Sequence, residues 1–146
     1  KDWVDVEETV DTKNRKIPFV RYPYPDETDA PWSFGEPGKA DIESGWETSE
    51  LDFIGKAGVP IMLRFFGQVE LTEPEGKLTF GSGKEVPIRL YRDGDKRVPG
   101  LDRFATMLLV PARELERGTT YSVTFRCKLD GVAFEKTWSF RTRPPN

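Results

Sequence analysis

Apolar and polar residues alternate strictly near the C-terminal end of the chain. Apolar side chains occupy every second position from Tyr121 to Cys127, and polar residues such as Ser122 separate them. A period of two is typical of a β-strand with one buried face and one face in water. The Asp130-Gly131 pair that follows predicts a two-residue hairpin turn. The pattern therefore indicates a hairpin of two half-buried strands.

The strand expected after this turn carries its large side chains on one face. Val132, Phe134, Trp138 and Phe140 form the apolar series, and Lys136 interrupts it. A charged residue in an apolar series predicts either a bulge at that position or a strand that leaves the sheet at its edge. Trp138 and Phe140 are predicted to be structural residues of the core.

Shorter alternating patterns upstream predict further strands, several of them closed by a turn signal or a proline. Their ranges are 17–22, 59–66, 69–71, 77–80, 86–90 and 104–110, with a loop expected at 73–76. About seven or eight strands with regularly spaced turns predict an all-β fold. The expected architecture is an immunoglobulin-like antiparallel β-sandwich with a long N-terminal loop.

Tyr121 opens its strand shortly after a glycine turn at Gly118. In immunoglobulin-like sandwiches, a tyrosine at this place folds its hydroxyl back onto the backbone a few residues upstream, which is called the tyrosine corner. We therefore predict that Tyr121 is buried and that its hydroxyl bonds to the backbone near Leu115 or Glu116.

The chain divides into a short arm and one domain. Residues 1–16 are polar and charged and predict a linker or N-terminal arm, and residues 17–146 predict a single domain. Within that domain, residues 23–58 have no sustained periodicity, and a connection of that length is uncommon and often functional. Its large apolar side chains predict that it is ordered and packs against the sandwich, because leaving them in water would be costly.

The C-terminal segment resembles bacterial immunoglobulin-like modules, which carry a Leu-x-x-Gly-Thr-x-Tyr corner and end in Trp-Ser-Phe-x-Thr. The matching residues are Leu115, Gly118, Thr119 and Tyr121, followed by Trp138-Ser139-Phe140-Arg141-Thr142. This resemblance implies an immunoglobulin-like fold and implies little about chemistry.

An upstream segment makes the resemblance more specific. Residues 20–31 are similar to the start of the immunoglobulin-like domain that follows CAP (cysteine-rich secretory/pathogenesis-related) domains in some secreted bacterial proteins. That start reads Tyr-Pro-x-x-x-Gln-Thr-x-Val-Pro, and this chain departs from it at Glu27 and Ala30. The resemblance covers roughly residues 20–142 and implies an extracytoplasmic accessory domain without an active site common to the family.

The composition excludes several kinds of chemistry. The chain has no histidine and one cysteine, so catalysis by a serine–histidine or cysteine–histidine pair is impossible and no internal disulfide can form. Zinc and copper would lack their usual nitrogen ligand. Cys127 lies in the apolar series of its strand and is predicted to be a small core residue. We predict no metal, no cofactor and no catalytic residue.

Charge and hydropathy exclude further classes. The net charge is −3 and the basic residues form no stripe, which disfavours nucleic acid as a partner. No apolar run approaches the roughly 20 residues that span a bilayer, so no transmembrane segment is predicted. No signal peptide is visible, but the chain begins at Lys1 instead of Met, so we expect a processed or trimmed chain.

The long loop holds an acidic stretch that allows three interpretations. Its carboxylates are Asp41, Glu43, Glu47, Glu50 and Asp52. They could form a solvated acidic loop, an oxygen-ligand calcium site, or a carboxylate pair for glycoside hydrolysis. Their spacing matches no EF-hand loop, which favours the solvated loop.

Aromatic residues in and beside the same loop are the candidate binding residues. They are Tyr22, Tyr24, Trp32, Phe34 and Trp46. Exposed, they would form a platform for a sugar ring or a partner protein; buried, they would form a satellite core over one end of the sandwich. The first outcome favours a carbohydrate-binding module and the second a spacer.

These observations predict a non-catalytic spacer or interaction module of a larger secreted or surface protein, located in the extracellular space or the cell envelope. Its expected partner is a protein or a component of the cell envelope. The alternative is a carbohydrate-binding module that takes a polysaccharide through the loop aromatics. An enzyme that uses the acidic loop is a third possibility with less support.

Overall fold

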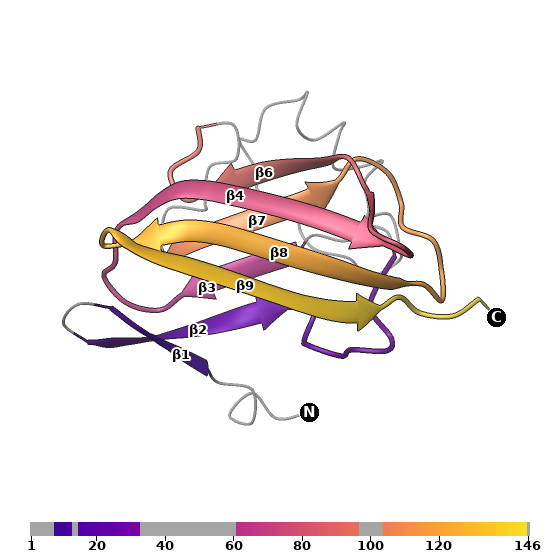
Figure 1. Cartoon of the computed structure of the whole chain (residues 1–146), viewed down its shortest axis with the longest axis horizontal. Coiled ribbons are helices and arrows are strands. Elements are labelled where there is room, and N and C mark those ends of the chain that lie inside the picture. Colours follow the sequence, from indigo (N-terminus) through magenta and orange to yellow (C-terminus); the bar gives the residue numbers. More distant parts are fainter. Residues whose placement is uncertain (1–7, 13–14, 33–60, 97–103, 146) are drawn as a thin grey trace.

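The computed structural model describes residues 8–12, 15–32, 61–96 and 104–145. The elements of these residues, in chain order, are β1 (Glu8–Asp11), β2 (Lys16–Tyr22), β3 (Ile61–Phe65), β4 (Leu71–Phe80), β5 (Lys84–Glu85), β6 (Ile88–Arg92), β7 (Ala105–Pro111), β8 (Thr120–Leu129) and β9 (Val132–Arg141). The strands pair antiparallel in two sheets, one with the order β1-β2-β3-β7-β6 and one with the order β5-β4-β8-β9 (Figure 1). This architecture confirms the predicted immunoglobulin-like β-sandwich.

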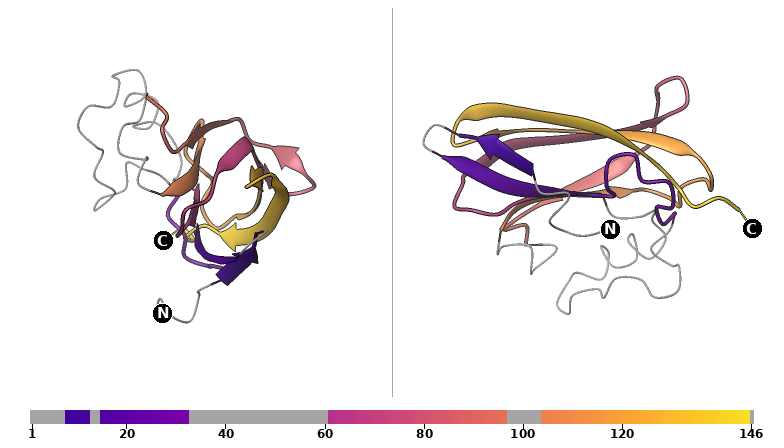
Figure 2. Two further views of the ribbon diagram at one scale, coloured as in Figure 1. Left: turned by 90° about the vertical axis from the view of Figure 1, so that its left-hand side faces the viewer. Right: turned by 90° about the horizontal axis from the view of Figure 1, so that it is seen from below.

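The two sheets face each other across one apolar core (Figure 2). β8 and β9 supply alternate side chains to it, as the period of two requires, and Phe125 and Trp138 stack there with ring centroids 5.7 Å apart. The five-stranded sheet contributes Phe19 and Phe65, which also contact each other. Trp138 and Phe140 are buried, with exposed fractions of 5% and 1%. The alternating residues of the sequence are therefore the inner faces of the sheets.

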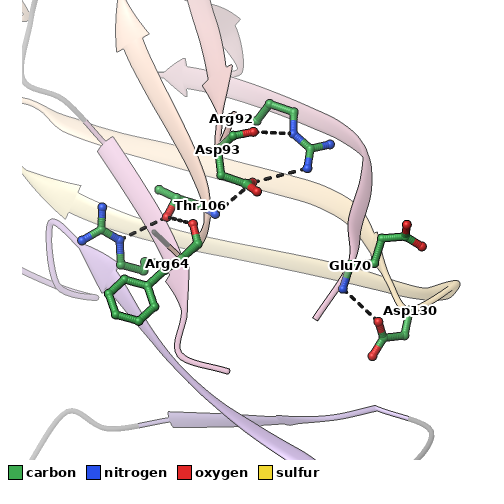
Figure 3. Close-up of polar contacts among 7 residues, drawn as sticks. Arg64, Glu70, Arg92, Asp93, Thr106 and Asp130 are labelled. Carbon is green, nitrogen blue, oxygen red and sulfur yellow. Dashed lines mark hydrogen bonds and ion pairs between the residues drawn. The ribbon is translucent and has the colours of Figure 1, made fainter. Parts of the chain in front are cut away.

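The turn between β8 and β9 has the backbone that its sequence requires. Asp130 and Gly131 both have positive φ angles, 52° and 83°. Asp130 also joins the hairpin to the start of β4, because its Oδ1 accepts the N–H of Glu70 at 2.8 Å and its own N–H donates to the Glu70 carbonyl (Figure 3). The predicted hairpin is thus also a link between neighbouring strands.

β4 corrects one prediction. The sequence suggested a loop at residues 73–76 between two short strands, but a single strand runs from Leu71 to Phe80. Its pairing with β8 shifts register between Thr72 and Glu75, and Glu73 has a φ of 52°. The extra residues are absorbed by an irregularity of the β-bulge kind, so the proline and glycine of this segment do not end the strand.

Lys136 causes no bulge. It lies on β9, an edge strand of its sheet, and pairs in register with Phe125 of β8. The Lys136 Nζ lies 3.7 Å from a carboxylate oxygen of Glu8 and 5.7 Å from the centroid of the Phe19 ring. An inward-pointing charge on an edge strand discourages pairing with other chains. The sequence pattern could not show that β1 would supply a counter-charge.

Glu8 belongs to the segment that was expected to be a linker or arm. Residues 8–11 instead form β1 and pair with β2. Glu8 makes two hydrogen bonds to Arg21, from Nε at 2.6 Å and from Nη2 at 2.7 Å. The Arg21 side chain is only 11% exposed. This ion pair therefore stabilises the packing of the short polar strand β1 against β2.

Candidate functional site

The end of the sandwich around Tyr121 is held together by side-chain contacts to the backbone. Tyr121 is 2% exposed, and its hydroxyl accepts the N–H of Glu116 at 2.8 Å. This contact confirms the predicted tyrosine corner. Burial raises the pKa of the Tyr121 hydroxyl, so it remains protonated and can serve as a steady hydrogen-bonding group.

Thr142 completes this region. Its side chain is fully buried, and its Oγ1 donates to the Glu116 carbonyl at 2.6 Å and accepts the N–H of Thr119 at 3.0 Å. Gly118, with a φ of 60°, donates its N–H to the carbonyl of Arg143. The turn before β8 is therefore fixed to the chain that leaves β9.

The segment after β2 docks against the edge of β9. Backbone hydrogen bonds link Asp26 to Ser139 at 2.8 Å, Arg141 to Glu27 at 2.6 Å and Ala30 to Arg141 at 3.1 Å. Ala30 also forms a parallel bridge with Thr142. The described part of the long loop, residues 23–32, thus packs on the sandwich as predicted, and residues 33–58 lie outside the described residues.

We call this region the corner end, defined by residues 26–32, 115–121 and 139–143. It holds one of the predicted binding residues, Trp32. The carbonyl of Trp32 accepts the N–H of Leu115, and the guanidinium carbon of Arg117 lies 4.2 Å from the centroid of the Trp32 ring. One face of this indole is therefore covered by a cation of the same chain.

Two other predicted binding residues, Tyr22 and Tyr24, do not form a flat platform. Tyr22 and Tyr24 are half-buried and lie nearly perpendicular, at 77°, with ring centroids 6.3 Å apart. Phe34 and Trp46 lie outside the described residues, as do the acidic residues of 41–52. Tyr22 and Tyr24 thus present no coplanar surface of the kind that a sugar ring stacks on.

Charged residues on the four-stranded sheet pair across strands on its outer face. Arg126 bonds to Glu135 at 2.6 Å, and Lys128 lies 3.1 Å from Glu73. A shallow groove of about 290 Å³ on this face is lined by Glu75, Gly76, Lys77, Glu85, Thr124, Arg126 and Glu135. Within the described residues, no group of three or more histidine, cysteine, aspartate or glutamate side chains is arranged to hold a metal ion.

Cys127 is buried, with 4% exposure, and is not disulfide-bonded. Burial raises the pKa of its thiol to about 12, and nearby Arg92 opposes this shift. Since the thiolate is the reactive form, this cysteine behaves as the core residue that its strand position predicts.

A second group of side chains lies at the other end of the sandwich, where β3 ends and β7 begins (Figure 1). Arg64 and Thr106 occupy paired positions on these strands, and the Arg64 Nε donates to Thr106 Oγ1 at 3.1 Å (Figure 3). Phe66 and Phe104 continue the same face, with ring centroids 5.2 Å apart. We call these four residues the Arg64 patch.

Hydrogen bonds to neighbouring residues fix the position of Thr106, the buried polar member of the patch. Thr106 is fully buried, its Oγ1 donates to the Phe104 carbonyl at 2.8 Å, and its backbone N–H donates to Asp93 Oδ1 at 3.3 Å. Asp93 also pairs with Arg92 at 3.3 Å. Figure 3 shows this chain of contacts from Arg92 to Arg64.

Arg64 itself is half-buried and lies 5.7 Å, by its guanidinium carbon, from the centroid of the Phe104 ring. Burial lowers its pKa, and no carboxylate of the described residues pairs with it. Phe66 is 38% exposed and is the exposed large apolar side chain of the described residues. The patch therefore combines a desolvated cation with an accessible aromatic surface.

These residues are not among the binding residues predicted from the sequence, although the sequence contains a signal for them. The polar face of the strand at 59–66 reads Met62, Arg64, Phe66, which is an unusual series for a face expected in water. That Phe104 and Thr106 lie beside it depends on the pairing of β3 with β7, which joins residues about 40 positions apart.

Sheets, corner and core together define a small antiparallel β-sandwich module. No protein-family model matches the chain, and no curated protein matches its sequence. Solved structures do match. CopC from Methylosinus trichosporium OB3b is 20% identical with a TM-score of 0.53, and the match covers 96% of each chain. A DUF4426 family protein from Pseudomonas aeruginosa PAO1 is 11% identical with a TM-score of 0.53, covering 99% of this chain and 100% of the other.

At these identities the likeness shows the fold alone. It agrees with the sandwich architecture and does not extend the resemblance to CAP-associated domains, which no comparison tests. Among the described residues there is also no helix with the length and apolar character needed to cross a membrane.

Proposed function

We propose that this chain is a non-catalytic immunoglobulin-like module of a secreted or cell-envelope protein, and that it acts as a stiff spacer that also contacts a protein partner. The observation that carries the proposal is that the backbone groups of the corner end are hydrogen-bonded within the chain itself. Loops of a sandwich commonly carry its ligand site, yet the described part of the long loop uses its backbone groups on β9 and the corner of its own chain.

The distribution of carboxylates supports the non-catalytic part of the proposal. Glu8, Glu73 and Glu135 each pair with a lysine or arginine, and Lys77 and Arg126 lie among the carboxylates Glu75, Glu85 and Glu135 that line the outer groove. General acid–base catalysis by two carboxylates needs both to converge on one cleft. The extracytoplasmic part rests on the resemblance of residues 20–31 and 115–142 to secreted bacterial modules.

The carbohydrate-binding alternative has less support from the geometry. A sugar ring stacks on an open aromatic face, whereas Arg117 covers one face of Trp32, and Tyr22 and Tyr24 stand nearly perpendicular to each other. Glycan-array binding that disappears in both Trp32→Ala and Tyr24→Ala would replace the proposal with this alternative.

Cell fractionation combined with in-cell cross-linking tests the proposal. The chain, expressed with its native flanking sequence, should occur in the envelope or the culture medium and form a defined protein adduct there. Exclusive recovery from the cytoplasm, or turnover of ester, peptide or glycoside substrates that is lost in Asp41→Asn or Glu47→Gln, would contradict it.

A further inference from the structure

Arg64 differs from the other arginines whose contacts the structure describes. Arg21, Arg92, Arg126 and Arg143 each bond to a carboxylate, and Arg117, which covers Trp32, is exposed to solvent. Arg64 is half-buried, but its described partners are a hydroxyl and a ring. Removing a cation from water without a paired anion costs free energy. A ligand that brings an anion to Arg64 would recover part of that cost.

The guanidinium is oriented for such a ligand. Thr106 uses its hydroxyl proton on the Phe104 carbonyl, so its oxygen is left to accept from Arg64 Nε. Figure 3 shows that the two Nη groups of Arg64 point away from Thr106. This end-on pair of N–H donors fits the two oxygens of one carboxylate. Because Thr106 is fully buried in a strand, the fork is held in place before any ligand arrives.

The rings beside Arg64 define what accompanies the carboxylate. Phe66 is 38% exposed and packs edge-on against Phe104. An exposed aromatic ring beside a fixed cation suits a segment that carries an apolar side chain next to an acidic one. A polyanion such as nucleic acid or a phosphate-rich surface would require several clustered cations, and the patch offers one.

We propose that the Arg64 patch docks an extended acidic-apolar segment of a partner protein, with an aspartate or glutamate of the partner on the Arg64 fork and a neighbouring apolar side chain on Phe66. The proposal deepens the proposed function, because it rests on the chain being an interaction module and names the surface and the chemistry of its partner. The proposed docking surface lies at the end of the sandwich opposite the corner end, so binding there would not disturb the packed loop residues 23–32.

Binding of synthetic peptides provides the direct test. An Asp-Leu repeat hexapeptide is titrated into the ¹⁵N-labelled chain, with its Asn-Leu counterpart as the uncharged control. The Arg64 Nε–H resonance and the amides around Phe66 and Thr106 should shift with the acidic peptide only. Added salt should weaken the binding, since one exposed partner charge is screened.

Variants separate the patch from general charge effects. Arg64→Met keeps the apolar stem and removes the charge, and Phe66→Ala removes the exposed ring; each should weaken peptide binding at least about tenfold, as the loss of one charged or one anchoring contact does. Arg126→Met makes the same change of charge on the other sheet and should leave the affinity unchanged. Equal binding of both peptides, no binding, or equal loss in Arg64→Met and Arg126→Met would overturn the proposal.

In-cell photo-cross-linking distinguishes failure of the patch from failure of the proposed function. A photoreactive residue is placed at Phe66 in one chain and at Thr137, on the exposed outer face of β9, in another. An adduct at Phe66 that Arg64→Met abolishes supports both proposals. An adduct at Thr137 without one at Phe66 overturns the patch and retains the interaction module. A Phe66 adduct that contains a second copy of this chain also overturns the patch, because the proposed partner is another protein.

Discussion

The corner end and the Arg64 patch contain the same kinds of residue but differ in how their polar and charged groups are paired. Both place a buried threonine at the centre, Thr142 at one end and Thr106 at the other, and both set an arginine beside an aromatic ring. At the corner end the threonine links two backbone segments of the chain. At the Arg64 patch, Thr106 positions a cation for which the described residues supply no anion.

Under the proposed function, the corner end contributes to stability and the Arg64 patch to binding. A buried polar group that is fully hydrogen-bonded fixes one structure, whereas a desolvated charge without a partner contributes little to folding and is available to a ligand. Substitutions at the corner end should therefore affect stability, and substitutions at the patch should affect binding. Three substitutions and a change of pH test that division, and their expected effects on stability decrease from Cys127 to Arg64.

Alkaline pH should lower the stability of the core around Cys127. The Cys127 thiol has a pKa of about 12 in the folded chain and about 9 when unfolded. Between these values the unfolded state binds fewer protons, so the free energy of unfolding should fall as pH rises, by up to about 1.4 kcal/mol per pH unit. Urea unfolding of the wild type and of Cys127→Ala from pH 8 to 10.5 measures this, and the difference between them cancels the contribution of Tyr121. If the free energies of unfolding of the two proteins change in parallel with pH, the thiol is not shielded from water in the folded chain.

Thr142→Val should destabilise the corner end by about 2 kcal/mol. The substitution keeps the shape but leaves the Glu116 carbonyl and the Thr119 N–H without their partner in a buried place, and an unsatisfied buried group costs about 1–3 kcal/mol. Chemical denaturation measures the change, with Thr142→Ser as the control that keeps the hydroxyl. A Thr142→Val variant as stable as wild type would show that water reaches these groups.

Tyr121→Phe should cost about 1 kcal/mol, the usual net contribution of one hydrogen bond. The ring would keep its packing against Phe80 and Phe140, and only the bond from the Glu116 N–H would be lost. Hydrogen exchange at the Glu116 amide gives a local readout, and it should become faster in the variant. Unchanged exchange together with unchanged stability would contradict the role of the hydroxyl in the corner.

Arg64→Met should change the free energy of unfolding by no more than about 0.5 kcal/mol, the range of substitutions away from stabilising features. The variant loses the contact with Thr106 but removes a desolvated charge, and the two effects oppose each other. Urea denaturation beside Thr142→Val measures the contrast between the two ends. A loss above about 2 kcal/mol would make Arg64 a structural residue and remove the basis of the comparison.

Local sequence was sufficient to predict the strands and turns that depend only on residues close to them in the chain. The alternation in residues 120–127 and 132–140, the Asp130-Gly131 turn and the Tyr121 corner all follow from side-chain period, backbone preference and short loops, and the structure has each of them. The wrong predictions concern residues whose local structure depends on a neighbouring strand. Pro74 and Gly76 do not break β4, because pairing with β8 continues across the bulge. Lys136 stays in register with β8, and Glu8 of β1 supplies its counter-charge.

The sequence by itself thus determined the class of fold, the hairpin, the corner and the absence of histidine chemistry, since these depend on residue type and on neighbours within about ten positions. Tertiary structure alone decided how charged residues more than about ten positions apart are placed relative to one another. Glu8 meets Arg21 through the pairing of β1 with β2, and Arg64 meets Thr106 and Phe104 through the pairing of β3 with β7. The cost of burying a charge depends on what surrounds it in space, and contacts between distant strands set those surroundings.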